Sequence, residues 1–268
     1  MPGTDKPYKF DFGTFEVKPF LVAKHLITYG QFQAFVDAED GFTDPRWWNK
    51  MPDEYLRQEL YNQRAKVKNA PRDSISWYQS VAFARWMNHR LHGLAIPMAQ
   101  VGTPFLASET MDGQNADGKN AVPTGSAWII GSNSEIRLPT EWEWQWMAQD
   151  GVKVNTYPWG EWQMGYANTS EAGLNRTTAV GVYPHGAADC GALDVAGNLW
   201  EWCLNDRNNP ETVDGYSNGQ SKVLRGGSFL DDLSNAAASA RNDHGPYFRN
   251  LYYGFRLVVV RLSPASDL

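Results

Sequence analysis

The sequence predicts one irregular α+β domain over residues 1–268, with short helices before residue 150 and a β-rich second half. Two observations support this. Three segments combine a capping residue with apolar residues at helical spacing, and residues 155–200 are dense in Gly and Pro before a series of short strand-like runs. Twelve each of Trp, Tyr and Phe supply enough apolar area for a substantial core.

The N-terminal part predicts three short strands and a helix. Residues 9–12, 15–17 and 20–22 alternate loosely between apolar and polar side chains, as strands do. Thr28 can cap a helix in which Phe32, Phe35 and Val36 follow the i, i+3, i+4 spacing of one buried face. The chain is therefore expected to enter its core through this helix.

Two more helices are predicted before residue 150. One starts at Ser76, carries an apolar face over 81–87 and ends before Gly93; the other has Thr140 as N-cap and Glu143 as its capping-box partner. Residues 94–134 between them are rich in small and polar side chains and are expected to form a long insertion with a short hairpin. In the second half, strands are expected at 199–204, 222–225 and 255–260.

Composition excludes several classes of protein. The net charge of −6 argues against a nucleic-acid partner, and no run of about 18 apolar residues is present that could span a membrane. The first residues lack the apolar core of a signal peptide, so a cytoplasmic location is expected. Cys190 and Cys203 are expected to be free thiols, since two cysteines do not form a disulfide framework.

Several motifs occur in a fixed order along the chain. They are Arg-Leu-Pro-Thr-Glu-Trp-Glu-Trp at 137–144, Asp-Val-Ala-Gly-Asn-Leu-Trp-Glu-Trp at 194–202, Gly-Gly-Ser at 226–228 and Gly-Phe-Arg at 254–256. This ordered set resembles the formylglycine-generating-enzyme family from about residue 15 to about residue 261. The resemblance implies a C-type-lectin-like fold, α+β and loop-rich, with short helices and a small antiparallel sheet.

The resemblance does not extend to the catalytic residues. The family's enzymes use two cysteines between the Gly-Gly-Ser and Gly-Phe-Arg strings, and the matching positions here are Leu233 and Ala238. Neither side chain can bind copper or form a mixed disulfide. A related branch holds non-haem iron with histidines, but the five histidines here are scattered, and only His89 and His92 share helical spacing. We therefore expect a protein that is not an enzyme and needs neither copper nor iron.

The resemblance also implies a possible calcium loop. Asp194 and Glu201 would supply carboxylates and Gly197 and Leu199 backbone carbonyls, which are the oxygen ligands that Ca²⁺ prefers. Two further residues, Asn168 and Thr169, match part of a second site less closely. The alternative is that the two carboxylates bind turn amides or a buried arginine such as Arg225 or Arg256.

The 25 residues 229–253 have an unusual composition. They contain no Lys, Glu, Gln, Met or Trp, although about five residues of these types would be expected by chance. This window, together with its flanking glycine motifs, resembles the variable segment of proteins diversified by retroelements. In such proteins, mutation of template adenines turns Asn codons into other codons that end in a pyrimidine.

That resemblance divides the window into fixed and variable positions. Arg241, Pro246 and Arg249 would be fixed. The candidate ligand-binding residues are Leu230, Asp231, Asp232, Asn235, Ala240, Asn242, His244, Gly245, Tyr247, Phe248, Asn250, Leu251 and Tyr252. Aromatic side chains beside polar ones are typical of protein-binding surfaces. If strands 222–225 and 255–260 pair, the window leaves and returns on one face and its side chains are exposed.

The sequence thus predicts a non-catalytic ligand-binding protein whose partner is an unidentified protein or other macromolecule. Two alternatives stay open. One is a formylglycine-generating oxidase or related oxygen-using enzyme, which the motif set favours. The other is a sensor or interaction module of a larger effector protein, which the abrupt Met1-Pro-Gly-Thr start favours.

Overall fold

A computed structural model describes residues 1–55, 59–96, 127–217 and 219–262. Within this part of the chain three α-helices occur, α1 (Tyr29–Asp37), α2 (Trp77–Arg90) and α3 (Glu141–Ala148). Thr28, Ser76 and Thr140 cap them, as the sequence predicts. At the start of each helix, the side chain of the cap residue accepts a hydrogen bond from the backbone N–H of the third helical residue. The side chain of that third residue in turn accepts a hydrogen bond from the backbone N–H of the cap residue.

The strands are short and the remaining helical turns are single. The strands are β1 (Tyr8–Phe10), β2 (Gly13–Phe15), β3 (Phe20–Val22), β4 (Ala95–Ile96), β5 (Trp128–Ile129), β6 (Ser134–Arg137), β7 (Trp200–Asp206), β8 (Lys222–Arg225), β9 (Arg241–His244), β10 (Tyr253–Gly254) and β11 (Val258–Arg261). The 3₁₀ turns are η1 (Pro45–Trp48), η2 (Asp53–Tyr55), η3 (Gly151–Lys153), η4 (Ser170–Ala172) and η5 (Pro184–Gly186).

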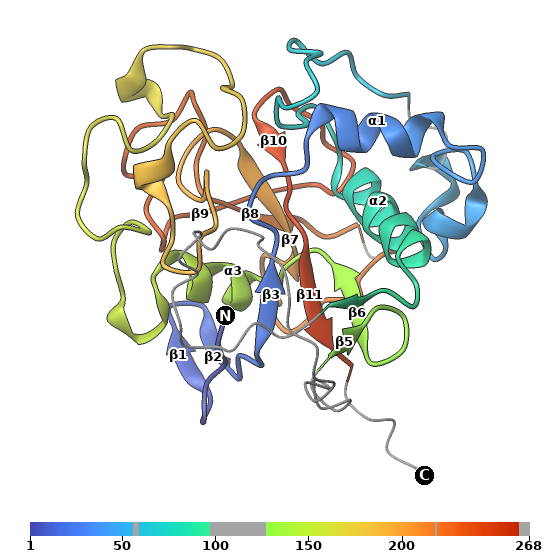
Figure 1. The fold of residues 1–268 in the computed structure, drawn as a ribbon, viewed down its shortest axis with the longest axis horizontal. Coiled ribbons are helices and arrows are strands. Elements are labelled where there is room, and N and C mark those ends of the chain that lie inside the picture. The colour runs from blue at the N-terminus through green and yellow to red at the C-terminus, as the bar shows by residue number, and fades with distance from the viewer. Residues whose placement is uncertain (56–58, 97–126, 218, 263–268) are drawn as a thin grey trace, which may run out of the picture.

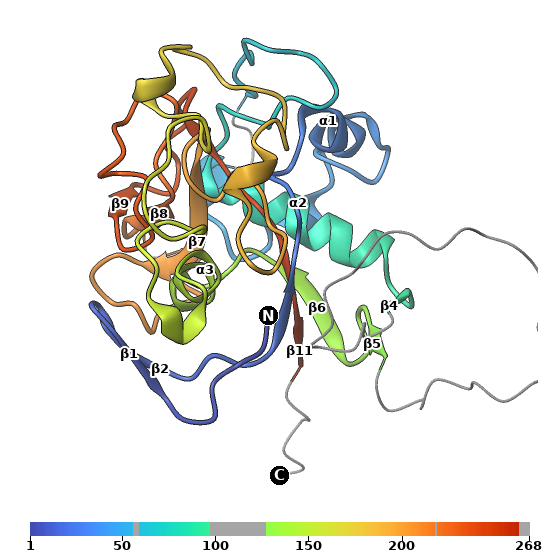
Figure 2. The same ribbon diagram turned by 60° about the vertical axis from the view of Figure 1, so that its left-hand side comes forward.

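Two small sheets form the centre of the molecule (Figures 1 and 2). One has the order β10-β7-β8-β9, with β10 parallel to β7 and the other pairs antiparallel. The other has the order β3-β11-β6, all antiparallel. The pairing of strands 222–225 and 255–260, which was the condition for the window to leave and return on one face, does not occur, because β8 and β11 belong to different sheets. Strand β9 lies inside the window and was not predicted, since its Arg-Asn-Asp-His sequence has no apolar residue.

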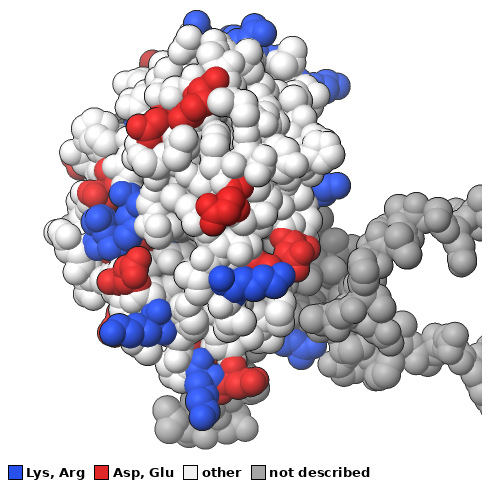
Figure 3. All heavy atoms as spheres, turned by 90° about the vertical axis from the view of Figure 1, so that its left-hand side faces the viewer, with Lys and Arg blue, Asp and Glu red and all other residues white. Residues whose placement is uncertain are grey.

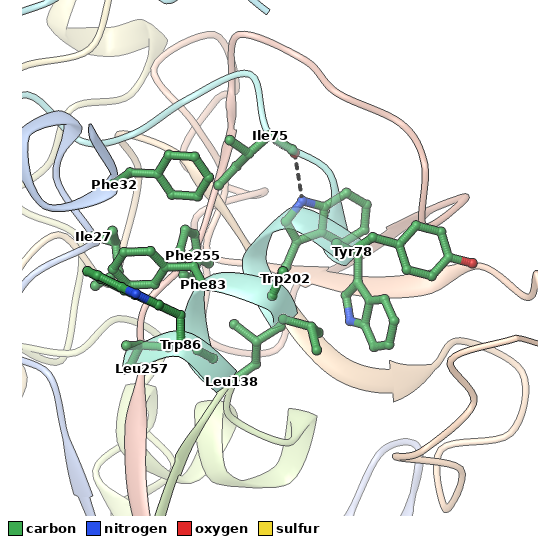
Figure 4. Packing of buried hydrophobic residues seen from close by; sticks show 14 of the residues in the cluster. Ile27, Phe32, Ile75, Tyr78, Phe83, Trp86, Leu138, Trp202, Phe255 and Leu257 are labelled. Carbon is green, nitrogen blue, oxygen red and sulfur yellow. Dashed lines mark hydrogen bonds between the residues drawn. The ribbon is translucent and has the colours of Figure 1, made fainter. Parts of the chain in front are cut away.

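The core is aromatic and is centred on α2, which packs against strands of both sheets (Figure 4). The Trp202 indole N–H donates to the Ile75 carbonyl oxygen at 3.2 Å, and that of Trp77 donates to the Cys203 carbonyl at 2.8 Å. Trp144 and Trp146 of α3 belong to a second cluster, which also contains Phe10 of β1. The window contributes buried Tyr253 to the first cluster and buried Ala238 to the second, and half-buried Tyr252 packs against the first.

The expected insertion lies mostly outside the described residues, because 97–126 are not described. At its two ends β4 and β5 pair antiparallel. No helix in the described ranges is long and apolar enough to cross a membrane.

Candidate ligand-binding site

Two arginines, one buried and one half-buried, hold the window against the sheet. Arg225, at the end of β8, is fully buried, and its guanidinium donates to the carbonyl oxygens of Ala238, Ser239 and Ala240. Arg241 begins β9 and donates two hydrogen bonds to the buried carboxylate of Glu141, at 2.5 and 2.7 Å. These charge-assisted hydrogen bonds fix the backbone path of residues 238–241 on the protein core.

Two glycines start the window. Gly226 and Gly227 have φ values of +95° and +70°, a region that side chains disfavour. A Cβ atom at Gly226 would lie 2.7 Å from the Val195 carbonyl oxygen, and one at Gly227 would lie 2.9 Å from the Asn235 carbonyl oxygen. The motif is therefore required by the backbone and not by ligand chemistry.

Backbone hydrogen bonds join the window to the rest of the chain at several points. Phe229 N donates to Asn198 O at 3.1 Å, Ala238 N to Thr156 O at 2.8 Å, Ser74 N to Asn250 O at 3.0 Å, and Trp200 N to Tyr252 O at 2.9 Å. Such bonds do not depend on which side chain the window carries. The segment can therefore keep one backbone path while its side chains change.

The thirteen candidate residues all retain solvent exposure. Leu230, Asp232, Asn235, Tyr247, Phe248 and Leu251 are exposed, and Asp231, Ala240, Asn242, His244, Gly245, Asn250 and Tyr252 are half-buried. Of the fourteen exposed large hydrophobic side chains among the described residues, five lie in these 25 positions. Exposed apolar side chains are thus concentrated in the window, as at binding surfaces.

The aromatic residues of the window contact one another. The His244 and Phe248 rings have centroids 3.5 Å apart, Phe248 and Tyr247 5.0 Å, and Tyr252 and Tyr253 4.9 Å. Burial lowers the pKa of His244, which favours a neutral ring in this cluster. The Tyr247, Phe248 and His244 rings thus form one aromatic group on the surface, whereas the Tyr252 ring packs against Tyr253, which is buried.

Asp231 differs from the other candidates because its side chain supports the fold. One carboxylate oxygen accepts hydrogen bonds from the Trp200 indole N–H at 2.8 Å and from the Ser228 hydroxyl. Trp200 is only 2% exposed, so its N–H would lose a partner if Asp231 became apolar. Because the Trp200 backbone N–H also donates to Tyr252 O, Asp231 near the start of the window and Tyr252 near its end are both hydrogen-bonded to Trp200.

The positions that match the family's cysteine pair are not alike. Leu233 is exposed and Ala238 is buried. Cys190 and Cys203 are both free, as expected, with Cys190 exposed and Cys203 buried. In the described part of the chain, no group of three or more His, Cys, Asp and Glu side chains is arranged to hold a metal ion.

Glu201, one of the two expected calcium carboxylates, binds a buried arginine. Arg256 donates to both of its oxygens at 2.6 Å, and the Trp144 indole N–H donates to one of them at 3.0 Å. The same guanidinium reaches the Leu193 and Asp194 carbonyl oxygens at 3.0 and 3.3 Å. Because Arg256 supplies the positive charge, Glu201 does not fit a calcium ligand in this arrangement.

The other expected calcium ligands surround a hydrogen-bonded turn. Asp194 accepts from Gly181 N at 2.7 Å, and burial raises the pKa of this carboxyl group. Gly197 and Leu199 flank Asn198, whose N–H donates to Asn168 O at 2.7 Å. The Asn168 Oδ1 and Thr169 Oγ1 atoms are buried without hydrogen-bond partners. Calcium binding by these residues stays a prediction.

A pocket of about 230 Å³ opens at the edge of the window and was not predicted. Leu251 and Phe229 of the window line it together with Arg64, Asp73 and Arg176. These residues come from three separate parts of the chain. Residues 64 and 73 carry no motif, so the sequence held no signal for this pocket.

The face shown in Figure 3 has no concentration of basic side chains that would suit a nucleic acid. On the face shown in Figure 3, acidic and basic side chains are scattered among uncharged ones. This view agrees with the net charge of −6.

Comparisons with known proteins place the fold. Hercynine oxygenase from Mycobacterium tuberculosis is 29% identical over 90% of this chain, which spans about half (53%) of that protein's length. Formylglycine-generating enzyme from Thermomonospora curvata is 28% identical over 91% of this chain and 82% of its own. Inactive C-alpha-formylglycine-generating enzyme 2 from Mus musculus is 26% identical over 94% and 79%.

Among solved structures, Treponema denticola variable protein 1 superimposes with a TM-score of 0.58 at 21% identity, covering 96% of this chain and 91% of its own. PvdO from Pseudomonas aeruginosa gives 0.59 at 16% identity, covering 97% and 90%. The described architecture is thus the C-type-lectin-like fold that the motifs imply. The profile of the sulfatase-modifying factor enzyme 1-like domain matches residues 8–261, and the chain belongs to this family.

Proposed function

We propose that this chain is a non-catalytic ligand-binding protein and that residues 229–253 form a binding site diversified by a retroelement. The observation that carries the proposal is the contrast between backbone and side chains in the window. Hydrogen bonds from Arg225 and Arg241, together with backbone hydrogen bonds, hold its path, while none of the thirteen candidate residues is buried. A segment that must accept many side chains needs this division.

The ligand that best fits the surface is a protein or another macromolecule. Phe248 and Tyr247 are each 40% exposed and in contact with each other, and the polar side chains of β9 lie beside them. Rigid aromatic residues give large contact area at a low cost in conformational entropy. We further propose a cytoplasmic location.

The comparisons contain both inactive and active relatives. A variable protein shares the fold, and an inactive formylglycine-generating enzyme is among the sequence relatives, in line with a binding role. Hercynine oxygenases and formylglycine-generating enzymes are also relatives, and an oxygen-using enzyme is the second candidate function. The absence of cysteine from 229–253 argues against the formylglycine reaction.

A third possibility is that the chain works as the sensor module of a larger effector. It spans about half the length of the hercynine oxygenases that it matches, so the domain occurs within longer proteins.

The gene locus tests the diversification. We expect a near-copy of the coding sequence for 229–253 that differs mainly at adenines, close to a reverse transcriptase gene. A sequenced locus with neither feature refutes diversification.

Affinity capture from the source cells tests the binding site itself. The wild-type chain should retain a partner that Phe248→Ala loses, whereas the control Leu94→Ala, exposed on the connection after α2, should retain it. Equal capture by both variants would place the binding site elsewhere.

A further inference from the structure

Two exposed arginines, Arg64 and Arg176, line the pocket at the edge of the window. Among the described residues, neither guanidinium group forms an ion pair or donates a hydrogen bond. Arg249 of the window is different, because its guanidinium donates to the Glu59 carbonyl oxygen and stacks on the Tyr61 ring. The two guanidinium groups of the pocket are therefore available to an anion from outside the chain.

A buried amide side chain holds the loop that carries Arg64. Gln63 is 3% exposed, and its Nε2 atom donates to the Ala65 and Pro71 carbonyl oxygens at 2.8 and 2.9 Å. Its Oε1 atom accepts from the Asp73 backbone N–H at 3.3 Å. The loop therefore keeps its path without any bond from the Arg64 side chain.

Buried asparagines hold the backbone at Arg176 in the same way. Asn168 Nδ2 donates to the Arg176 carbonyl oxygen at 2.9 Å, and Asn198 Oδ1 accepts from the Thr178 backbone N–H at 3.1 Å. Both asparagines are at most 1% exposed. Two fixed loops thus carry two unpaired guanidinium groups to one pocket, and a site fixed in advance loses less entropy when it binds.

The pocket is locally basic in an acidic chain. Residues 60–72 contain four basic side chains and no acidic one, although the net charge of the whole chain is −6. Asp73 is the acidic residue of the lining, and it is 2% exposed. Its charge would oppose a doubly charged anion more than a singly charged one, so the lining favours a carboxylate over a phosphate group.

The shape of the pocket also suits a carboxylate on a short side chain. A guanidinium group binds a carboxylate through two parallel hydrogen bonds. Phe229 and Leu251 give the pocket apolar walls, against which the methylene groups of an acidic side chain can pack. A volume of about 230 Å³ is small for a drug-sized ligand, so it suits a single side chain.

We propose that this pocket is a subsite of the binding face and that it takes the carboxylate side chain of an Asp or Glu residue of a protein partner. The proposal rests on the proposed function, because Leu251 is one of the variable positions and joins the pocket to the window. Arg64 and Arg176 lie outside the variable positions. Every variant of the site would therefore keep the same preference for an acidic anchor.

Blocked amino acids test the subsite without a known partner. The probes are the N-acetyl methylamides of glutamate, glutamine and lysine, together with inorganic phosphate. Each is titrated at pH 7 and constant ionic strength into the ¹⁵N-labelled full chain. We expect saturable amide shifts at Ala65, Thr177 and Leu251 with the glutamate probe. Saturation at these amides by the glutamine or lysine probe, tighter binding of phosphate than of glutamate, or no saturation by glutamate would each overturn the proposal.

Variants then separate the subsite from a general effect of charge. Arg64→Gln and Arg176→Gln should each weaken the glutamate probe roughly fivefold, as expected for one exposed ion pair, and the double variant should abolish saturation. The control Arg90→Gln removes the same charge from a side chain that is 55% exposed and outside the pocket, and it should leave the affinity unchanged. Unchanged affinity in both pocket variants, or an equal loss in the control, contradicts the subsite.

Failure of the subsite and failure of the proposed function look different. A partner whose capture depends on Phe248 but not on Arg64 or Arg176 would keep the binding face and remove the subsite. Binding of the glutamate probe without any partner that depends on Phe248 would do the opposite.

Discussion

Truncating Trp200 should destabilise the fold far more than truncating Phe248. Trp200 begins β7, is 2% exposed, donates its indole N–H to Asp231 and pairs its backbone N–H with Tyr252 O. Removal of a buried Trp side chain costs about 3–5 kcal/mol. We expect the upper part of that range, because the hydrogen bond to a carboxylate is lost as well.

Phe248 is the matched comparison on the binding face. It is 40% exposed, and its ring contacts are with His244 and Tyr247, which keep solvent exposure themselves. Phe248→Ala should therefore cost about 1 kcal/mol of folding free energy or less. In a binding hot spot it should weaken a captured partner by roughly 1–3 kcal/mol. Tyr252 is a poorer choice, because it is half-buried and packs against two core clusters.

Denaturant titration of the wild type, Trp200→Ala and Phe248→Ala measures how much folding free energy each substitution costs. Thermal melts provide a second reading, since each kcal/mol shifts the midpoint by about 2–4 °C in a chain of this size. If Phe248→Ala lost as much stability as Trp200→Ala, the window would be part of the core and the division between scaffold and binding face would be wrong.

Other predictions concern buried charge and metals. Arg256→Ala should cost about 3–5 kcal/mol in denaturant titrations because it leaves the Glu201 charge buried and unpaired, and adding Glu201→Gln should restore part of the loss. Burial raises the pKa of Asp73 to about 6, so its carboxylate opposes folding as pH rises from about 4 to 6. Asp73→Asn should therefore raise stability by on the order of 2–3 kcal/mol at pH 7 and by nothing near pH 3, as denaturation at both pH values would show. Because Arg256 pairs with Glu201, the predicted calcium loop keeps Asp194 as its carboxylate ligand, so Ca²⁺ should raise the melting temperature by no more than about 1 °C; a larger rise would show that Glu201 exchanges Arg256 for the ion. Incubation with copper and a Cys-x-Pro-x-Arg peptide should produce no mass loss at the peptide cysteine, and turnover would establish an enzyme.

The helix starts were predictable because their causes are local. A capping box joins residues three apart, so Thr28, Ser76 and Thr140 mark their helices without any knowledge of the fold. The Gly-Gly-Ser motif marked the position of the window in the sequence, and the structure adds that Gly226 and Gly227 have left-handed backbone. The ordered motifs implied the lectin-like fold. The unusual composition of residues 229–253 identified the segment whose thirteen candidate residues keep solvent exposure in the structure.

Tertiary structure decided the pairings that join distant residues. Strand β9 forms because the polar segment Arg241–His244 pairs with the edge of β8. Glu201 faces Arg256 because β10, which ends two residues before Arg256, pairs with β7 at Glu201. The role of Asp231 depends on the position of the Trp200 indole, 31 residues away in the chain. The pocket around Asp73 combines three segments that share no spacing or motif. Such contacts are selected by packing and desolvation across the whole molecule, and no local pattern encodes them.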